Sequence, residues 1–297
     1  MASVVPRKTV LVLGGSGFVG SHLVRVLLHR GYDVVSASQT GRSPMSLLSL
    51  PLNNLKDVSP GSLQTVKVDA RDALALSSLV QSREFNAYAH CVGVLFDSST
   101  LLSRFNVKVS HSKSLIDPKA TYDDITRRTA ENLLNAIVTK NKKKPPIADH
   151  PPPPFVFVSA SEAGWSQEMG LGGRFANTVS SFVAPWLYSY LEAKRAVERL
   201  LLGSDSVRGV VMRPALVFTT PNIFTHIFGF VANTMRLLPK GMLTPFVDKP
   251  IHVEDLADGM ARAIEDAGVR GIFREELIVR LLTVVPSKVI PPSLASK

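Results

Sequence analysis

Cysteine is nearly absent from this sequence, because Cys91 is the only one among its 297 residues. A single thiol cannot form an internal disulfide and cannot supply the thiolate clusters of structural zinc sites. Disulfide-stabilised scaffolds and cysteine-rich zinc modules are therefore excluded, and we expect no metal site. A reducing compartment fits this composition.

Long hydrophobic runs are also lacking, since no stretch reaches the roughly 18 unbroken apolar residues of a membrane-spanning helix. The first expected strand begins near Thr9, which leaves no room for a signal peptide, so we expect any organelle targeting to be internal or unusually short. With 45% apolar and 20% charged residues, the composition is that of a globular protein, soluble or bound peripherally to a membrane.

Acidic residues are fewer than basic ones, with 24 Asp and Glu against 34 Lys and Arg, and the net charge is +10. Such an excess favours anionic partners, namely nucleotide phosphates, acidic lipid head groups or nucleic acid. Basic residues are not interleaved with aromatic ones, so we expect no nucleic-acid partner. Part of the charge falls in residues 140–154, a lysine- and proline-rich segment that we expect to be a solvated loop. Its lysines are Lys140, Lys142, Lys143 and Lys144.

Short β-branched runs alternate with helical patterns through most of the chain. This alternation predicts an α/β fold, a doubly wound parallel sheet of the Rossmann type with helices on both faces. The expected strands are residues 9–13, 33–38, 65–69, 87–94, 155–159 and 209–212, and the expected helices are residues 18–30, 73–80, 123–138 and 185–202.

Beyond these cycles the pattern becomes less regular. We expect a dinucleotide-binding domain over residues 7–220 and a small substrate-covering lobe over residues 221–282, partly integrated with the first domain. Residues 223–243 fit an ordinary core helix equally well. The proline-containing tail, residues 283–297, is expected to be disordered.

Three glycines follow the first expected strand and open the first expected helix. In Gly14-x-x-Gly17-x-x-Gly20 they permit a tight turn and a close approach of the backbone, while the helix N-terminus offers N–H groups to a pyrophosphate. The sequence therefore predicts a dinucleotide site. Its expected contacts in this loop are Gly14, Gly15, Ser16, Gly17, Phe18, Val19 and Gly20.

A carboxylate is missing where NAD-preferring sites hold the ribose hydroxyls, at the end of the second expected strand. Here Ser38 and Arg42 stand instead, and both suit a 2′-phosphate. We therefore prefer NADP(H) as the cofactor, with NAD(H) as the alternative. Asp69, at the end of the third expected strand, is expected either to bond the adenine amino group or to cap the following helix.

A tyrosine and a lysine lie four residues apart in Tyr190-Leu-Glu-Ala-Lys194, on one face of an expected helix. A nearby ammonium is expected to lower the pKa of the phenol, so that Tyr190 can exchange a proton with a substrate oxygen. Ser161, after the fifth expected strand, is expected to hold that oxygen. Tyr188 and Ser159 compete for these roles, although Tyr188 points to another helix face.

Together, the glycine motif, Ser161, Tyr-x-x-x-Lys and Arg213-Pro214 resemble the short-chain dehydrogenase/reductase superfamily in its extended and atypical branches, which include epimerases and dehydratases. The resemblance covers about residues 7–280, and it adds expected cofactor contacts at Ala70, Cys91, Val92, Gly93, Lys194 and Pro214. The insertion at residues 140–154 and the long interval between Ser161 and Tyr190 depart from the family pattern.

More narrowly, the segments beginning at Val12, Ser38, Cys91 and Ser159 resemble a fungal mitochondrial branch associated with coenzyme Q biosynthesis. That branch is similar to the NADPH-binding accessory subunit of respiratory complex I. The resemblance implies a mitochondrial protein on the matrix side of the inner membrane, with a quinone-synthesising assembly and anionic lipid as partners. Apolar stretches at residues 175–187 and 223–231 could contact lipid or a prenyl tail, or pack internally.

Three functions are consistent with these features. The first is an NADP(H)-dependent oxidoreductase acting on a quinone-related or other small apolar substrate. The second is a non-catalytic NADPH-binding scaffold in a membrane-associated complex, in which nucleotide stabilises the fold. The third is a nucleotide-sugar epimerase or dehydratase, against which the missing carboxylate after the second strand counts.

Overall fold

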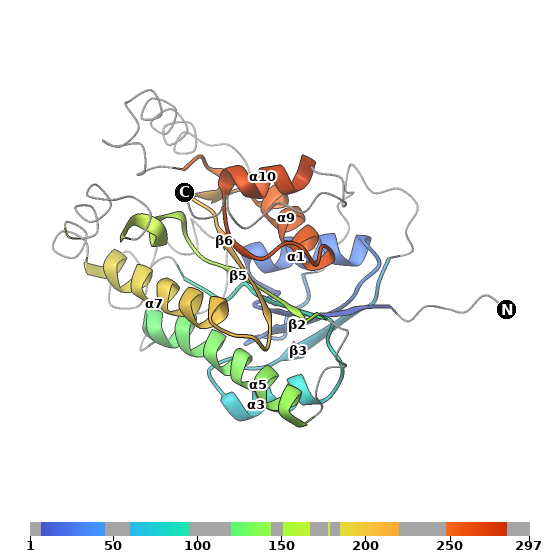
Figure 1. Cartoon of the computed structure of the whole chain (residues 1–297). Coiled ribbons are helices and arrows are strands. Elements are labelled where there is room, and N and C mark those ends of the chain that lie inside the picture. Colours follow the sequence, from blue (N-terminus) through green and yellow to red (C-terminus); the bar gives the residue numbers. More distant parts are fainter. Residues whose placement is uncertain are drawn as a thin grey trace.

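A parallel sheet forms the centre of the computed structural model (Figure 1). The structure describes residues 7–44, 60–94, 120–143, 151–166, 178, 185–219 and 248–283. Within these ranges the sheet has the strand order β3-β2-β1-β4-β5-β6-β9, and each neighbouring pair is parallel. Its strands are β1 (Thr9–Leu13), β2 (Asp33–Ser38), β3 (Leu63–Lys67), β4 (Ala87–His90), β5 (Pro154–Val158), β6 (Arg208–Arg213) and β9 (Gly271–Arg274).

Helices cover both faces of the sheet, which gives three layers (Figure 1). The helices on one face are α1 (Phe18–His29), α9 (Val253–Glu265) and α10 (Glu275–Thr283), and those on the other are α3 (Ala73–Gln81), α5 (Thr129–Lys143) and α7 (Pro185–Leu202). The π-helix η2 (Asp123–Arg128) leads into α5, and the 3-10 helix η3 (Ser161–Ser166) follows β5. A short second sheet pairs β7 (Val217–Phe218) with β8 (Ile251–His252). The predicted doubly wound α/β fold is confirmed.

Alternation along the strands divides the apolar residues between two cores. In β1, Val10 and Val12 pack in the core beneath α1 and α9, whereas Leu11 and Leu13 pack in the core beneath α3, α5 and α7. Because both faces are covered, the central strands β1 and β5 are mostly apolar rather than alternately polar. The strand order reverses between β1 and β4, and in open parallel sheets this is the point where ligands bind.

Several elements match the prediction: the observed bounds of β1, β2 and α7 are the same as the predicted ones. The third strand lies two residues earlier than expected, and β4 ends at His90 instead of residue 94. The lysine- and proline-rich loop was predicted to start at residue 140, and this start was wrong because α5 continues to Lys143. The Lys140 ammonium donates to the carbonyls of Val80 (3.1 Å) and Arg83, so it is anchored to the end of α3. Residues 144–150 lie outside the described part of the chain.

The described C-terminal residues are part of the main unit. Strand β9 pairs with β6, helix α9 packs on α1, and α10 packs on α9. Residues 220–247 and 284–297 lie outside the described residues, so the lobe, its boundary and the disordered tail stay predictions. Within the described ranges, no helix is both long enough and apolar enough to cross a membrane.

Candidate functional site

The glycine loop after β1 is packed so closely that side chains cannot be added to most of it. Gly14 has a φ of +83°, and a Cβ there would lie 2.9 Å from the backbone of Cys91. A Cβ on Gly15 would lie 2.3 Å from the Ser36 hydroxyl oxygen, and one on Gly20 would lie 2.2 Å from the Gly14 carbonyl oxygen. The loop is therefore pressed between β2, β4 and its own helix.

The start of helix α1 has the features of an anion-binding site. Its N-cap is Gly17, no side chain caps it, and no acidic residue lies in its first turn. A Cβ on Gly17 would approach only the Gly14 carbonyl, at 3.1 Å, so this glycine faces open space on its other side. An uncapped helix N-terminus favours an anion through its N–H groups and its dipole. Bare backbone around an uncapped helix start fits the diphosphate of a dinucleotide.

The other loop positions are consistent with this placement. Ser16, Phe18 and Val19 are half-buried at the start of α1. Cys91 continues from β4 and donates its backbone N–H to the Leu13 carbonyl (2.8 Å). The remaining predicted contacts after β4 are Val92, which is half-buried, and Gly93, which is exposed. The structure therefore brings together the loops after β1 and β4, at the reversal point of the sheet.

The end of β2 forms a tight turn that contains no carboxylate. The Gly41 N–H donates to the Ser38 hydroxyl (3.1 Å) and to its carbonyl (3.2 Å), and Gly41 has a φ of +63°. Arg42 follows directly and is exposed. Among the described residues, no carboxylate forms an ion pair with Arg42, so its guanidinium is available to a ligand.

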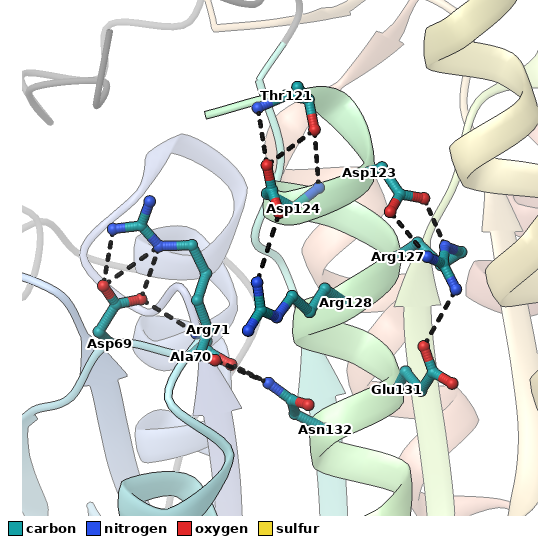
Figure 2. Close-up of polar contacts among 10 residues, drawn as sticks. All are labelled: Asp69, Ala70, Arg71, Thr121, Asp123, Asp124, Arg127, Arg128, Glu131 and Asn132. Carbon is teal, nitrogen blue, oxygen red and sulfur yellow. Dashed lines mark hydrogen bonds and ion pairs between the residues drawn. The ribbon is translucent and has the colours of Figure 1, made fainter. Parts of the chain in front are cut away.

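Asp69 does not cap a helix, so that alternative was wrong. Asp72 is the N-cap of α3, and its carboxylate accepts from the N–H groups of Leu74 and Ala75, both at 3.0 Å. Asp69 instead pairs with Arg71, with 2.7 Å between carboxylate oxygen and Nη2 (Figure 2). Hydrogen bonds from the Arg71 side chain lower the pKa of Asp69 to about 2. The carboxylate is therefore ionised and can accept further hydrogen bonds.

Helix α5 holds the turn that carries Asp69. The Asn132 amide donates to the carbonyls of Ala70 (3.0 Å) and Arg71 (3.1 Å), as Figure 2 shows. Ala70 is buried under this contact. The other pairs in Figure 2 involve residues of η2 and α5 and, in one case, Thr121 just before η2: Thr121 with Asp124, Arg128 with Asp124, and Arg127 with Asp123 and Glu131.

Lys194 lies deep in the structure beside the candidate tyrosine. The residue is 4% exposed, and its ammonium donates to the Val158 carbonyl (2.7 Å). The ammonium lies 5.6 Å from the centre of the Tyr190 ring, and a Cβ on Gly93 would lie 3.4 Å from it. Burial lowers the pKa of Lys194 to about 8. The loop after β4 therefore lies beside the same lysine as the candidate proton donor.

The expected lowering of the Tyr190 pKa was wrong in direction. Burial raises the pKa of the Tyr190 phenol, and the Glu162 carboxylate and the Tyr122 phenol raise it further. Tyr122 packs edge-on against Tyr190, with 5.5 Å between ring centres. Tyr190 is consequently a neutral phenol near neutral pH, able to donate a proton. The competing Tyr188 is exposed on another face of α7.

Ser159 and Ser161 have different surroundings. The Ser159 hydroxyl donates to the Glu198 carboxylate (2.5 Å) in a fully buried contact, so it is committed to the core. Ser161 is also buried, and its N–H donates to the carbonyl of Pro214 (2.9 Å). Its hydroxyl bonds to Glu162, whose pKa burial raises. Sequence reasoning passed over Glu162, although its place next to Ser161 was a visible signal.

A buried ion pair that sequence reasoning also missed joins β6 to α7. The Arg213 guanidinium donates to both carboxylate oxygens of Glu198, at 2.9 Å from Nε and 2.6 Å from Nη2. Glu198 lies one turn after Lys194, and Arg213 directly precedes Pro214. The pair therefore fixes helix α7 relative to the backbone that holds Ser161. Pairing a buried charge is necessary because an isolated one is very costly.

Known proteins resemble this chain in sequence, both as a family and as individual relatives. The model of the NAD dependent epimerase/dehydratase family matches residues 10–273. UDP-glucose 4-epimerase 1 of Oryza sativa subsp. japonica is 36% identical over 87 residues, which are 29% of this chain and 24% of that protein. UDP-glucose 4-epimerase 2 of Arabidopsis thaliana is 30% identical over 118 residues, 39% of this chain and 33% of that protein. The matches thus span a quarter to a third of the length of these relatives.

Solved structures with the same fold include an oxidoreductase of the short chain dehydrogenase/reductase family from Burkholderia thailandensis. It is 14% identical, with a TM-score of 0.57 over 94% of each chain. UDP-glucose 4-epimerase from Brucella ovis in complex with NAD is 16% identical, with a TM-score of 0.53 over 92% of this chain and 81% of that one. One family model spans the sequence from β1 to β9, and the chain therefore belongs to the NAD dependent epimerase/dehydratase family, with a Rossmann fold like that of short-chain dehydrogenases.

Proposed function

We propose that this protein is an oxidoreductase that binds NADP(H) and uses Tyr190 as its proton donor and acceptor. The observation that carries this proposal is the placement of Tyr190 and Lys194 beside the loop after β4, next to the glycine loop after β1. When bound, the nicotinamide supplies or accepts a hydride. The residues of this chain then need only hold the substrate oxygen and move one proton.

Within this proposal, the neutral Tyr190 phenol donates its proton to the substrate oxygen during reduction. Lys194, charged below a pKa of about 8, stabilises the phenolate that remains. Ser161 orients the oxygen, and its backbone is held by Pro214. The preference for NADP(H) over NAD(H) rests on Ser38 and Arg42 at the end of β2, where no carboxylate stands.

The proposed substrate is a quinone-related or prenylated intermediate of coenzyme Q biosynthesis. Its support is the resemblance of the segments beginning at Val12, Ser38, Cys91 and Ser159 to the mitochondrial coenzyme Q branch. The same resemblance supports a place on the matrix side of the inner membrane, within a quinone-synthesising assembly. The net charge of +10 suits peripheral contact with anionic lipid.

Two other functions each have a specific observation in their favour. Epimerisation of a nucleotide sugar is favoured by the names of the curated relatives, which are UDP-glucose 4-epimerases. A non-catalytic, NADPH-binding scaffold is favoured by the raised pKa of Tyr190, because a phenol with a raised pKa gives up its proton less readily. In the scaffold, bound nucleotide would stabilise the fold by mass action.

One set of measurements separates these functions. The nucleotide that co-purifies with the full chain is identified by mass spectrometry. NADPH oxidation is then followed with a short-chain prenylated quinone and, separately, UDP-glucose conversion is followed with NAD. The Tyr190→Phe variant is compared with Tyr188→Phe, which alters an exposed tyrosine on the same helix.

If the protein is an oxidoreductase, Tyr190→Phe should lower quinone-dependent turnover by at least about a hundredfold, while the Kd for NADPH stays nearly constant. Tyr188→Phe should behave as wild type. Tightly bound NAD together with UDP-glucose conversion would establish the epimerase instead. If Tyr190→Phe fully restores growth to a strain that lacks this protein, both catalytic functions are excluded and the non-catalytic scaffold is supported.

A further inference from the structure

Strand β3 contributes a cation to the same edge of the site as Arg42. Lys67 is the last residue of β3, and it pairs in register with Ser38, the last residue of β2. The Val68 N–H donates to the Ser38 carbonyl (2.9 Å), which fixes the two strand ends together. Lys67 is exposed, and sequence reasoning did not select it.

The turn after β2 is folded directly onto this lysine. A Cβ on Gly41 would lie 2.9 Å from the Lys67 Cβ and 3.3 Å from its Cα. Glycine at position 41 therefore serves two needs, a positive φ of +63° and the close approach to Lys67. Because Arg42 is the next residue, the guanidinium and the ammonium start from adjoining backbone.

The local charge at these strand ends is positive. Asp69 is the nearest carboxylate along β3 and its continuation, and Arg71 already neutralises it through an ion pair. Among the described residues, neither Lys67 nor Arg42 has an acidic partner. Two unpaired cations and the Ser38 hydroxyl thus border the position where a carboxylate would exclude a 2′-phosphate.

We infer that Lys67 and Arg42 together form the subsite for the 2′-phosphate of NADP(H), with Ser38 at its base. This inference rests on the proposed use of NADP(H) and names the residue that strengthens that preference. A dianionic phosphate accepts hydrogen bonds from both cations at once, whereas the ribose hydroxyl of NAD(H) offers no charge to either.

The test uses 2′,5′-ADP and 5′-AMP as probes, because they differ only in the 2′-phosphate and need no turnover. Their Kd values are measured calorimetrically for the full chain at low and high salt. The variants are Lys67→Gln, Lys67→Arg and Arg42→Gln. The control is Lys142→Gln, which removes the same charge from an exposed site near the end of α5.

Wild type is expected to bind 2′,5′-ADP more tightly than 5′-AMP. Lys67→Gln and Arg42→Gln should each weaken 2′,5′-ADP binding roughly tenfold and leave 5′-AMP binding unchanged. Lys67→Arg and Lys142→Gln should keep the preference. High salt should reduce it, because both cations are exposed.

Failure of the inference and failure of the proposed function give different results. If wild type prefers 2′,5′-ADP and Lys67→Gln keeps that preference, the role of Lys67 is refuted while NADP(H) use stands. If wild type binds both probes equally, the preference for NADP(H) is refuted, and the subsite with it. If neither probe binds, the dinucleotide site itself is refuted.

Discussion

At the scale of single residues, His90 is a titratable group that the fold buries completely and holds uncharged. His90 is fully buried at the end of β4, and its Nε2 lies 2.9 Å from the Thr129 hydroxyl. That hydroxyl donates to the Ile125 carbonyl (2.6 Å), so the hydrogen between the two side chains belongs to Nε2. Nδ1 has no hydrogen-bond partner among the described residues. His90 is therefore held as the neutral imidazole.

Acid should destabilise the protein through this residue. Burial, aided by the charge of Lys194, lowers the pKa of His90 to about 3, from 6.5. The unfolded chain thus binds a proton that the folded chain refuses between these two values, and stability falls as the pH falls through this window. The expected loss is at most about 1.4 kcal/mol per pH unit from this one group.

Urea unfolding of wild type and His90→Gln between pH 7 and pH 5 measures the effect. Glutamine keeps a donor for Thr129 but does not titrate, so the free energy of unfolding of this variant should depend less steeply on pH. Equal slopes for the two proteins would show that His90 does not carry the proton-linked term.

At the scale of elements, Asn132 is expected to hold the turn that carries Asp69. Replacing Asn132 with Ala removes two hydrogen bonds from α5 to the carbonyls of Ala70 and Arg71. The free energy of unfolding should fall by about 1–3 kcal/mol, because each bond contributes roughly 0.5–1.5 kcal/mol. Denaturant unfolding and amide hydrogen exchange at residues 70–72 measure the two consequences.

The matched control lies three residues further along the same helix. Asn135 is exposed, so Asn135→Ala should leave both stability and exchange near wild type. Exchange at residues 70–72 that is equally slow in both variants would mean that α5 does not hold the turn.

The elements also show what the sequence could predict and why. Local patterns were sufficient for β1, β2, α1 and α7, where apolar periodicity and the glycine turn act within one segment. Strand β9 was missed because it is four residues long, and only its pairing with β6 makes it a strand. The π-helix η2 carries no local signal either. The ion pair between Glu198 and Arg213 joins residues on different elements, so tertiary packing alone reveals it.

In the candidate site too, some features follow from local sequence and others only from tertiary packing. The glycine loop and the pair Tyr190 and Lys194 follow from spacing within one helix or turn. The direction of the Tyr190 pKa did not follow, because burial and Glu162 depend on the packing of η3 against α7. Lys67 escaped notice for the same reason, since only the register of β2 with β3 brings it beside Gly41.

At the scale of the whole molecule, bound nucleotide should stabilise the fold, because the site exists only when the loops after β1 and β4 meet. A ligand that binds only the folded state stabilises it by about 2.7 kcal/mol at a hundredfold excess over its Kd. Thermal unfolding of wild type should therefore shift upward with NADPH, and the shift should grow with its concentration.

Two glycine variants distinguish the site from the fold. Gly17→Ala adds a Cβ that meets only the Gly14 carbonyl at 3.1 Å, whereas in Gly20→Ala that distance is 2.2 Å. Gly17→Ala should melt near wild type without ligand but lose most of the NADPH shift, since its methyl group would occupy the open side of the loop that is proposed to bind the diphosphate. Gly20→Ala should melt lower even without ligand, because the loop must move. An undiminished NADPH shift in Gly17→Ala would mean that the nucleotide binds elsewhere than at the start of α1.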